Sequence, residues 1–258
     1  MASPKIIDTH THIFVEEFSA DRNQIITRAS EVCRALILPN IDEESIAQVE
    51  AVCGQWPDLC FPALGLHPSS VPEEPGDVLN RMEALLQSRK WYGIGETGLD
   101  LYWDKSTLSQ QVVSLHRHCD WAIEYDLPLI LHSREATSET ISLIRERQEG
   151  KLRGVFHCFT GTLAEAEAIL DLGFYLGVGG VITYPKSELK NVLKAVDQTR
   201  IVLETDSPWL PPVPYRGKRN ESSYIRHVAE AIALSWHVST DEVAEITSRN
   251  ALELFRLP

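Results

Sequence analysis

Short runs of apolar residues alternate along the chain with longer segments whose apolar residues recur every three or four positions. The short runs are typical of buried strands and the longer segments of amphipathic helices. The candidate strands lie at residues 5–8, 34–40, 61–66, 92–96, 127–131, 153–157, 174–180 and 200–204. The helical spacing is clearest at residues 42–56, 77–90, 108–126 and 162–173. In the last of these segments Thr162 precedes Glu165 by three residues, a capping-box pattern that marks a helix start.

Near-continuous apolar strands that alternate with helices predict a parallel sheet covered by helices. Eight such units in about 250 residues are typical of a (β/α)8 TIM barrel. We therefore predict an α/β protein with a single barrel domain over residues 1–258, closed by a C-terminal helix at residues 248–255. An open doubly wound sheet is the alternative, but no GxGxxG pattern follows the first run and no Pro- or Ser-rich linker divides the chain.

Composition narrows the classes of function. The chain has 258 residues, 43% of them hydrophobic, which is enough to bury a large core. It contains no apolar stretch of membrane-spanning length, and its start, MASPKIID, lacks a signal-peptide pattern, so we expect a cytoplasmic protein with no membrane partner. Five cysteines without a CxxC pair indicate neither a disulfide framework nor a thiolate zinc site. The net charge of −13 argues against nonspecific clamping of nucleic acid, so an anionic substrate would be bound locally.

Histidines and acidic residues gather at the ends of the predicted strands. Asp8, His10 and His12 alternate directly after the first run, and because alternate residues of an extended chain share a side, we expect the three to converge. The other members of this pattern are His67, Glu96, His132, His157, Glu204 and Asp206. In a (β/α)8 barrel the carboxyl ends of the strands form the functional face. The pattern therefore predicts that distant parts of the chain meet in one polar site.

Imidazoles and carboxylates are ligands of divalent metal ions, and the candidates here are Zn, Mn and Mg. Two neighbouring ions need a shared ligand, and Glu96, flanked by Gly95 and Gly98, suits that role. Such a pair activates water and stabilises charge on a phosphoryl or carbonyl oxygen. We predict a centre of one or two divalent ions, begun by His10 and His12 and completed from the fourth, fifth, sixth and eighth strands.

Seven short motifs make the chain similar to a known family. They are DTHTH (8–12), GLHP (65–68), GETGLD (95–100), HSR (132–134), HCFTG (157–161), ETDSP (204–208) and RGKRNE (216–221). In order and spacing they resemble the TatD family of metal-dependent deoxyribonucleases, in the amidohydrolase superfamily, over nearly the whole chain. The resemblance implies a (β/α)8 fold, divalent metal ions and hydrolysis of phosphodiester bonds at DNA 3′ ends. It further implies that one ion is held by His10, His12, Glu96 and Asp206, and a second by Glu96, His132 and His157.

The same resemblance implies catalytic and substrate-binding roles. Asp206 would accept a proton from the attacking water, and His67 would face the substrate phosphate. Basic residues in the nearby loops fit an anionic substrate, because arginine can form paired hydrogen bonds with phosphate and lysine supplies a point charge. They are Arg134, Arg216, Lys218 and Arg219. Aromatic residues near the same loops could stack on unpaired bases or pack at the rim; they are Phe14, Tyr102, Trp103, Trp209 and Tyr215. We expect a DNA end or another phosphodiester as the ligand, and no obligate protein partner is evident.

Two other functions stay open at this point. The same ligand set serves hydrolysis of C–N, lactone or other ester bonds in small molecules, because function depends on the site and not on the fold. Many enzymes of that kind bridge their ions with a carboxylated lysine at the fourth strand, where this chain has Glu96, and this favours the nuclease. A noncatalytic metal-binding protein is the third alternative; the presence of Asp206 and of every ligand position argues against it.

Overall fold

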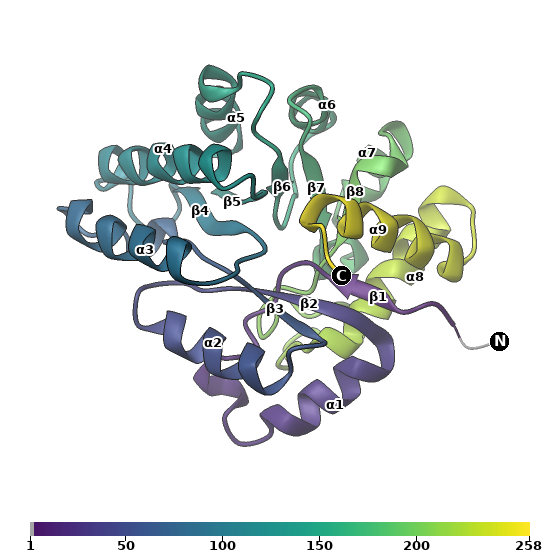
Figure 1. Ribbon diagram of the computed structural model, residues 1–258. Helices are drawn as coiled ribbons and strands as arrows, with labels where there is room; N and C mark the ends of the chain where they lie inside the picture. The colour runs from purple at the N-terminus through teal and green to yellow at the C-terminus, as the bar shows by residue number, and fades with distance from the viewer. Residues whose placement is uncertain (1–2) are drawn as a thin grey trace.

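Eight parallel strands run through the centre of residues 3–258, which this computed structural model describes (Figure 1). Residues 1–2, which begin both the predicted 1–258 domain and the segment without a signal-peptide pattern, lie outside the described residues. The first sheet contains β1 (Ile6–Asp8), β2 (Cys33–Pro39) and β3 (Cys60–Ala63). The second contains β4 (Ile94–Asp100), β5 (Leu129–Arg134), β6 (Gly154–Phe156), β7 (Tyr175–Val178) and β8 (Ile201–Leu203).

The two sheets meet at both of their edges. At one junction the Thr9 amide donates to the Leu203 carbonyl at 2.9 Å, which joins the segment after β1 to β8. At the other, the Leu64 amide donates to the Gly93 carbonyl at 3.1 Å, which joins the segment after β3 to the start of β4. The strands therefore follow one another in chain order around the molecule. This is the TIM-barrel-like arrangement that the alternating pattern predicts.

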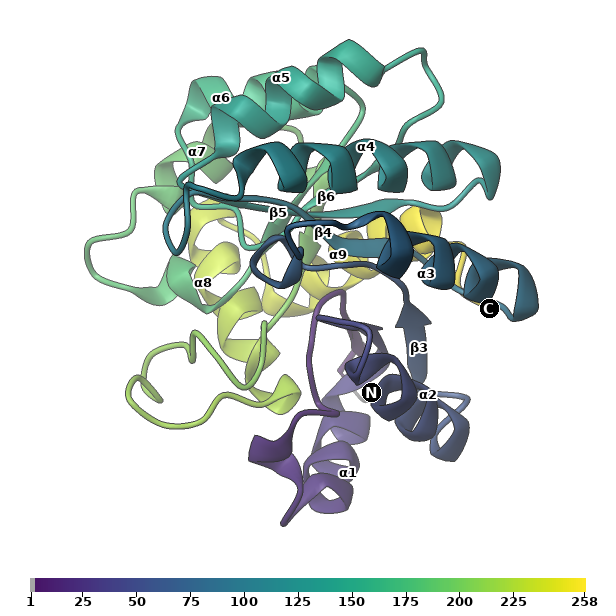
Figure 2. The same cartoon turned by 90° about the vertical axis from the view of Figure 1, so that its left-hand side faces the viewer.

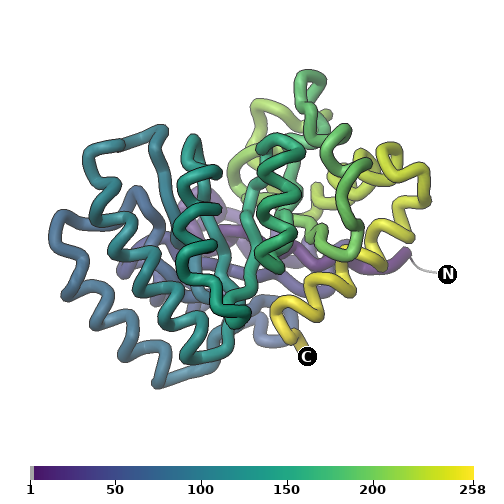
Figure 3. Tube along the Cα trace, turned by 90° about the horizontal axis from the view of Figure 1, so that it is seen from above, coloured from purple at the N-terminus to yellow at the C-terminus, as the bar shows by residue number. Residues whose placement is uncertain are grey.

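Helices surround the strands on their outer side (Figures 1 and 3). They are α1 (Arg22–Val32), α2 (Ser45–Gln55), α3 (Gly76–Ser88), α4 (Leu108–Glu124), α5 (Thr137–Arg147), α6 (Leu163–Asp171), α7 (Leu189–Ala195), α8 (Ile225–Trp236) and α9 (Thr240–Phe255). Short 3-10 turns are η1 (Glu16–Phe18), η2 (Pro68–Ser70), η3 (Gly180–Thr183), η4 (Gln198–Arg200) and η5 (Ser222–Tyr224). Figure 2 shows α4 between α3 and α5, over β4 and β5. Among residues 3–258, none of these helices combines the length and apolar character needed to cross a membrane.

The predicted helix start at residue 162 is confirmed. Thr162 Oγ1 accepts from the Glu165 amide, and the Glu165 carboxylate accepts from the Thr162 amide at 2.7 Å. Two of the first four amides of α6 are satisfied by this capping box.

Alternate residues of β2 enter two different parts of the core. Ala35 and Ile37 join an inner cluster enclosed by the strands, whereas Leu36 and Leu38 pack outward under the helices. Helix α9 adds three residues to the inner cluster, Ala251, Leu254 and Phe255. Its Asn250 side chain donates to the carbonyl of Ile201, at the amino end of β8. Because α9 covers the amino ends of the strands, the carboxyl ends are the open face on which polar side chains gather.

Candidate metal centre

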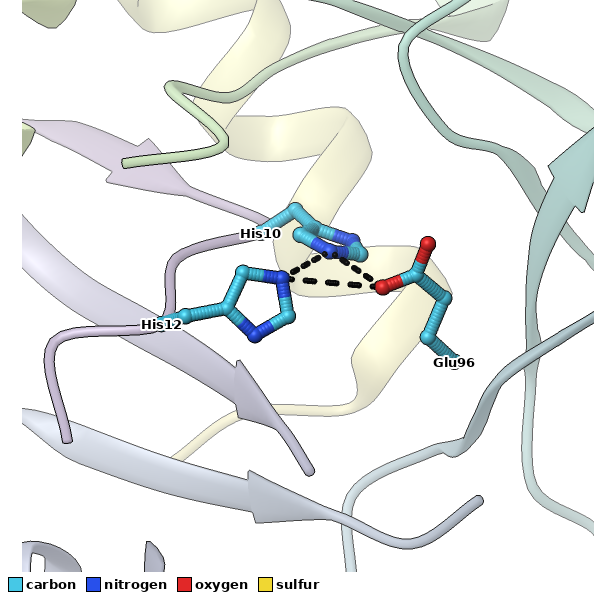
Figure 4. A group of neighbouring side chains, drawn as sticks. All are labelled: His10, His12 and Glu96. Atoms are coloured by element: carbon cyan, nitrogen blue, oxygen red, sulfur yellow. Dashed lines mark hydrogen bonds and ion pairs between the residues drawn. The ribbon is translucent and has the colours of Figure 1, made fainter. Parts of the chain in front are cut away.

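The Glu96 carboxylate, on β4, lies between two pairs of imidazoles, of which those of His10, His12 and His157 are buried and that of His132 is partly buried. Its Oε2 atom is 3.1 Å from His10 Nε2 and 3.6 Å from His12 Nε2 (Figure 4). Its Oε1 atom is 2.8 Å from His132 Nδ1 and 3.2 Å from His157 Nε2. The two oxygens of one side chain therefore face different histidines, from opposite parts of the sequence.

His10 and His12 lie on an extended segment directly after β1. Thr11, between them, forms a parallel bridge with Ser207, and its amide donates to the Ile37 carbonyl at 3.1 Å. These contacts hold the segment extended, so the two rings point to the same side and their Nε2 atoms are 2.9 Å apart. The convergence expected for this pair of histidines is present.

Asp8 does not join them, contrary to the expected convergence. Its Oδ1 accepts from the Thr205 amide at 2.9 Å and its Oδ2 from the Thr205 hydroxyl at 2.7 Å. Asp8 is the last residue of β1, and its side chain ties that strand to the segment after β8. Burial raises the pKa of Asp8 to about 7, even though hydrogen bonds from Thr205 act in the opposite direction. Asp8 is therefore a structural link and not a candidate ligand.

Asp206 completes the polar group around Oε2 of Glu96. Its Oδ1 is 3.5 Å from His12 Nε2 and 3.8 Å from His10 Nε2. The Asp206 backbone has a φ of 53°, a left-handed conformation that aspartate tolerates better than most residues. Its amide donates to the His10 carbonyl at 2.9 Å, so the segments after β1 and β8 are fixed to each other at this point.

Two further carboxylates orient the histidines on the other side of Glu96. Asp100 Oδ2 is 2.9 Å from His132 Nε2, and Glu204 Oε1 is 3.2 Å from His157 Nδ1. Asp100 fixes a proton on His132 Nε2 through a hydrogen bond, and the charge of Glu204, at ion-pair distance, favours a proton on His157 Nδ1. In both rings the other nitrogen is directed at Glu96. The sequence analysis missed Asp100 and gave Glu204 no particular role. The predicted strand ends at Glu96, so strand alternation gives no signal for Asp100, which shares a face with Glu96 because β4 extends to residue 100.

Burial and neighbouring charges shift pKa values in opposite directions in the polar cluster formed by Glu96, its neighbouring histidines and Asp206. Burial opposes ionisation of Glu96, but the nearby His157, His67 and His10 hold its pKa well below the ordinary value. Burial also lowers the pKa of His157, yet Glu204 and Glu96 together raise it well above 6.5. The metal-free cluster therefore keeps an ionised carboxylate beside a protonated imidazole, a charge pattern that a divalent cation can replace.

The donor atoms of His10, His12 and Glu96, around Oε2, lie close enough to hold a metal ion, and on the other side the donor atoms of His67, Glu96 and His132 lie within 4.8 Å of one another. Two ligand atoms that each lie about 2.1 Å from a zinc ion are at most about 4.2 Å apart. His10 Nε2, His12 Nε2 and Glu96 Oε2 lie 2.9 to 3.6 Å from one another, and Asp206 Oδ1 lies 3.5 and 3.8 Å from the imidazole nitrogens of His12 and His10. In the group around Oε1, the two imidazole nitrogens that face Glu96 already have the opposite ring nitrogen directed at a carboxylate. His132 Nδ1 lies 2.8 Å from Glu96 Oε1. Two lone pairs at this distance repel each other, so a proton or a cation must lie between the two atoms.

His67 offers a different function from the other histidines of the cluster. Its Nδ1 accepts from the Ser69 amide at 3.1 Å, so in the neutral ring the proton is on Nε2. Nε2 lies 3.4 Å from Glu96 Oε1 and 3.2 Å from His132 Nδ1. Burial lowers the pKa of His67 despite the nearby Glu96, which favours this neutral form. His67 therefore presents an N–H donor to the cluster and not a lone pair.

The predicted basic residues lie outside the cluster. Within residues 3–258, no hydrogen bond or ion pair links Arg134, Arg216 or Lys218 to Glu96. The guanidinium carbons of Arg134 and Arg216 lie 3.8 and 4.4 Å from ring centroids of tyrosines. Arg219, which the sequence analysis grouped with them, is instead paired with Asp21 at 2.6 Å. It anchors the loop and does not present a free charge.

Comparison with known proteins places this chain in a family. A model of the TatD related DNase family matches residues 7–256. Over 254 residues the chain is 34% identical to a Bacillus subtilis (strain 168) protein described as "Uncharacterized metal-dependent hydrolase YabD", covering 98% of this chain and 99% of that one. Over 259 residues it is 31% identical to the "3'-5' ssDNA/RNA exonuclease TatD" of Erwinia tasmaniensis, covering 98% and 100%.

A solved structure is similar over the same length. The crystal structure of YjjV, a TatD homologue from Escherichia coli K12, has a TM-score of 0.92 and 31% identity, with 98% of each chain covered. Fold and relatives together define a metal-dependent hydrolase. The chain belongs to the TatD related DNase family, as the seven sequence motifs indicate.

Proposed function

We propose that this protein hydrolyses phosphodiester bonds at the 3′ ends of DNA and uses two divalent metal ions. His10, His12, Glu96 and Asp206 hold one ion, and Glu96, His132 and His157 hold the other. The observation that carries the proposal is the division of the Glu96 carboxylate between two pairs of imidazoles. The relative named as a 3′-5′ ssDNA/RNA exonuclease supports the choice of substrate.

The proposed chemistry assigns separate tasks to the residues. When bound, the ions activate water and act as Lewis acids toward a phosphoryl oxygen. Burial opposes ionisation of Asp206, but its contacts with His12 and His157 lower its pKa, so it is ionised at neutral pH and able to accept a proton. His67 donates its Nε2 proton to a nonbridging oxygen of the phosphate. Arg134, Arg216 and Lys218 bind phosphates of the strand.

The test is hydrolysis of an end-labelled single-stranded DNA oligomer. Metal-stripped protein is resupplied separately with Mg²⁺, Mn²⁺ or Zn²⁺, and the Glu96→Ala variant is run alongside. Glu167→Ala, which removes an exposed carboxylate on α6, is the matched control. The proposal predicts metal-restored shortening from the 3′ end in the wild type and in the control, and none in Glu96→Ala.

Two results would contradict the proposal. Full activity of Glu96→Ala would remove the shared carboxylate from the mechanism. Absence of DNA cleavage with every metal, together with turnover of a lactone or amide, would leave the metal centre in place and assign the protein to small-molecule hydrolysis.

A further inference from the structure

An exposed pair of aromatic rings lies in the loop that follows β4. The Tyr102 and Trp103 rings meet edge to face, with centroids 4.9 Å apart and an interplanar angle of 86°. Trp103 is 68% exposed, more than any other aromatic side chain of residues 3–258, and Tyr102 is 49% exposed. A large apolar surface that is left open in this way commonly marks a binding site.

A cation lies against this pair. The Arg134 guanidinium carbon is 3.8 Å from the Tyr102 centroid and 5.3 Å from the Trp103 centroid. Arg134 is the last residue of β5, two residues beyond His132, and its carbonyl accepts from the Leu101 amide at 3.0 Å. The stacked guanidinium keeps donors available for an anion while it braces the ring beneath it.

Asp100 fixes the aromatic loop to the metal centre. Its Oδ1 accepts from the amides of Tyr102 and Trp103 at 2.9 and 3.0 Å, while its Oδ2 faces His132 Nε2 at 2.9 Å. Gln111, on α4, accepts from the Asp100 amide at 2.9 Å and so holds the same turn from behind. One carboxylate thus positions a candidate metal ligand and the backbone that carries both rings.

We infer that Tyr102, Trp103 and Arg134 form a nucleobase subsite, in which an unpaired base stacks on the aromatic pair and Arg134 binds the adjoining phosphate. The inference rests on the proposed function and specifies which part of the strand is recognised. Stacking requires an open base face, so the subsite selects single-stranded ends over duplex. It also supplies affinity that the overall charge of −13 would otherwise oppose.

The subsite is tested by a double-mutant cycle between protein and DNA. A series of oligomers carries a single abasic residue at successive positions from the 3′ end, and kcat/KM is measured for the wild type and for Trp103→Ala. In the wild type, one position should lose about 10-fold in kcat/KM when its base is removed. In Trp103→Ala that position-specific loss should disappear, and Trp103→Phe, which keeps a ring, should restore it. Leu234→Ala, a change at a 77% exposed residue on α8, should keep the wild-type profile.

The outcomes separate the subsite from the proposed function. An unchanged position-specific loss in Trp103→Ala overturns the subsite while cleavage itself stands. If the wild type does not cleave DNA, the proposed function fails. The subsite is then tested by binding, with dissociation constants for the same oligomers measured by fluorescence anisotropy in place of kcat/KM. Equal affinities of the wild type and Trp103→Ala for the intact oligomer overturn the subsite in that case, and weaker binding by the variant supports it.

Discussion

The His157 ring lies between two carboxylates, with Nδ1 at 3.2 Å from Glu204 Oε1 and Nε2 at 3.2 Å from Glu96 Oε1. Glu204 also accepts from the amide of Cys158, so its own carboxylate is fixed from a second direction. The orientation of one proposed metal ligand therefore depends on a residue that does not touch the metal position. Such outer carboxylates raise the basicity of the imidazole and limit its rotation.

Replacing Glu204 with glutamine should weaken metal binding without removing a ligand. The amide keeps the size of the side chain but loses the charge that supports His157, so we expect affinity to fall about 10- to 100-fold. Competition with a chromophoric chelator measures the change. Glu167→Gln, at an exposed position on α6, is the control. An unchanged affinity in Glu204→Gln would show that this contact does not support metal binding.

Metal binding should release protons and strengthen as the pH rises. Burial lowers the pKa of His132, but its contacts with Asp100 and Glu96 raise it above 6.5 overall, and the pKa of His157 is raised further. In the metal-free protein, the stability that these raised pKa values contribute is complete below pH 6.5 and is lost as the pH rises through them. The metal and these protons compete for the same imidazole nitrogens, so the affinity for metal increases as the pH rises.

Calorimetry tests this linkage. The protein is titrated with metal at pH 7 in two buffers of different ionisation enthalpy. The difference between the two binding heats, divided by the difference between the buffer ionisation enthalpies, should correspond to release of about one to two protons per chain. Identical heats in the two buffers would mean that both imidazoles are already neutral in the metal-free protein.

Asn220 should be essential for the loop that carries Arg216 and Lys218. Its buried Nδ2 donates to the carbonyls of Thr205 and Trp209 at 2.8 and 2.7 Å. Asn220→Ala leaves both acceptors without their donor, and we expect the free energy of unfolding to fall by about 1–3 kcal/mol. Urea unfolding of the metal-free protein measures the loss. The exposed Asn23→Ala should change this free energy by less than about 0.5 kcal/mol, and a similar small effect at Asn220 would contradict the anchoring role.

Arg216 should act in substrate binding and not in the chemical step. Its guanidinium carbon lies 4.4 Å from the Tyr184 ring centroid, a contact that leaves its donors free for phosphate. For Arg216→Ala we expect KM for single-stranded DNA to rise roughly 10-fold, with a shallower salt dependence and kcat nearly unchanged. Steady-state kinetics at several salt concentrations test this. Arg81→Ala, which removes an exposed arginine of α3 that is paired with Glu43, controls for loss of charge. An effect on kcat alone would exclude the binding role.

Much of the fold follows from the hydrophobic pattern because the strands are buried on both faces. β2 shows this: Ala35 and Ile37 face the inner cluster, Leu36 and Leu38 face the helices, and the result is an unbroken apolar run. The prediction of a single domain over residues 1–258 stays a prediction.

The hydrophobic pattern is least informative at β4, the strand that carries Glu96 and Asp100. This strand extends to Asp100, beyond the predicted end at residue 96, through glycines and polar residues that resemble a turn. Gly98 has a φ of 139°, and a Cβ there would lie 2.0 Å from the His132 carbonyl oxygen. A residue with a side chain does not fit between β4 and β5 at this point. The extension of β4, which puts Asp100 on the same face as Glu96, thus depends on a close strand contact that hydrophobic periodicity does not reveal.

The central claim is that Glu96 joins two metal ions, and a crystal structure of the manganese-loaded protein with anomalous scattering tests it most directly. The account predicts two anomalous peaks. One should contact Glu96 Oε2 together with His10 and His12, and the other should contact Oε1 together with His132 and His157. A single peak, or peaks that do not contact Glu96, would contradict it.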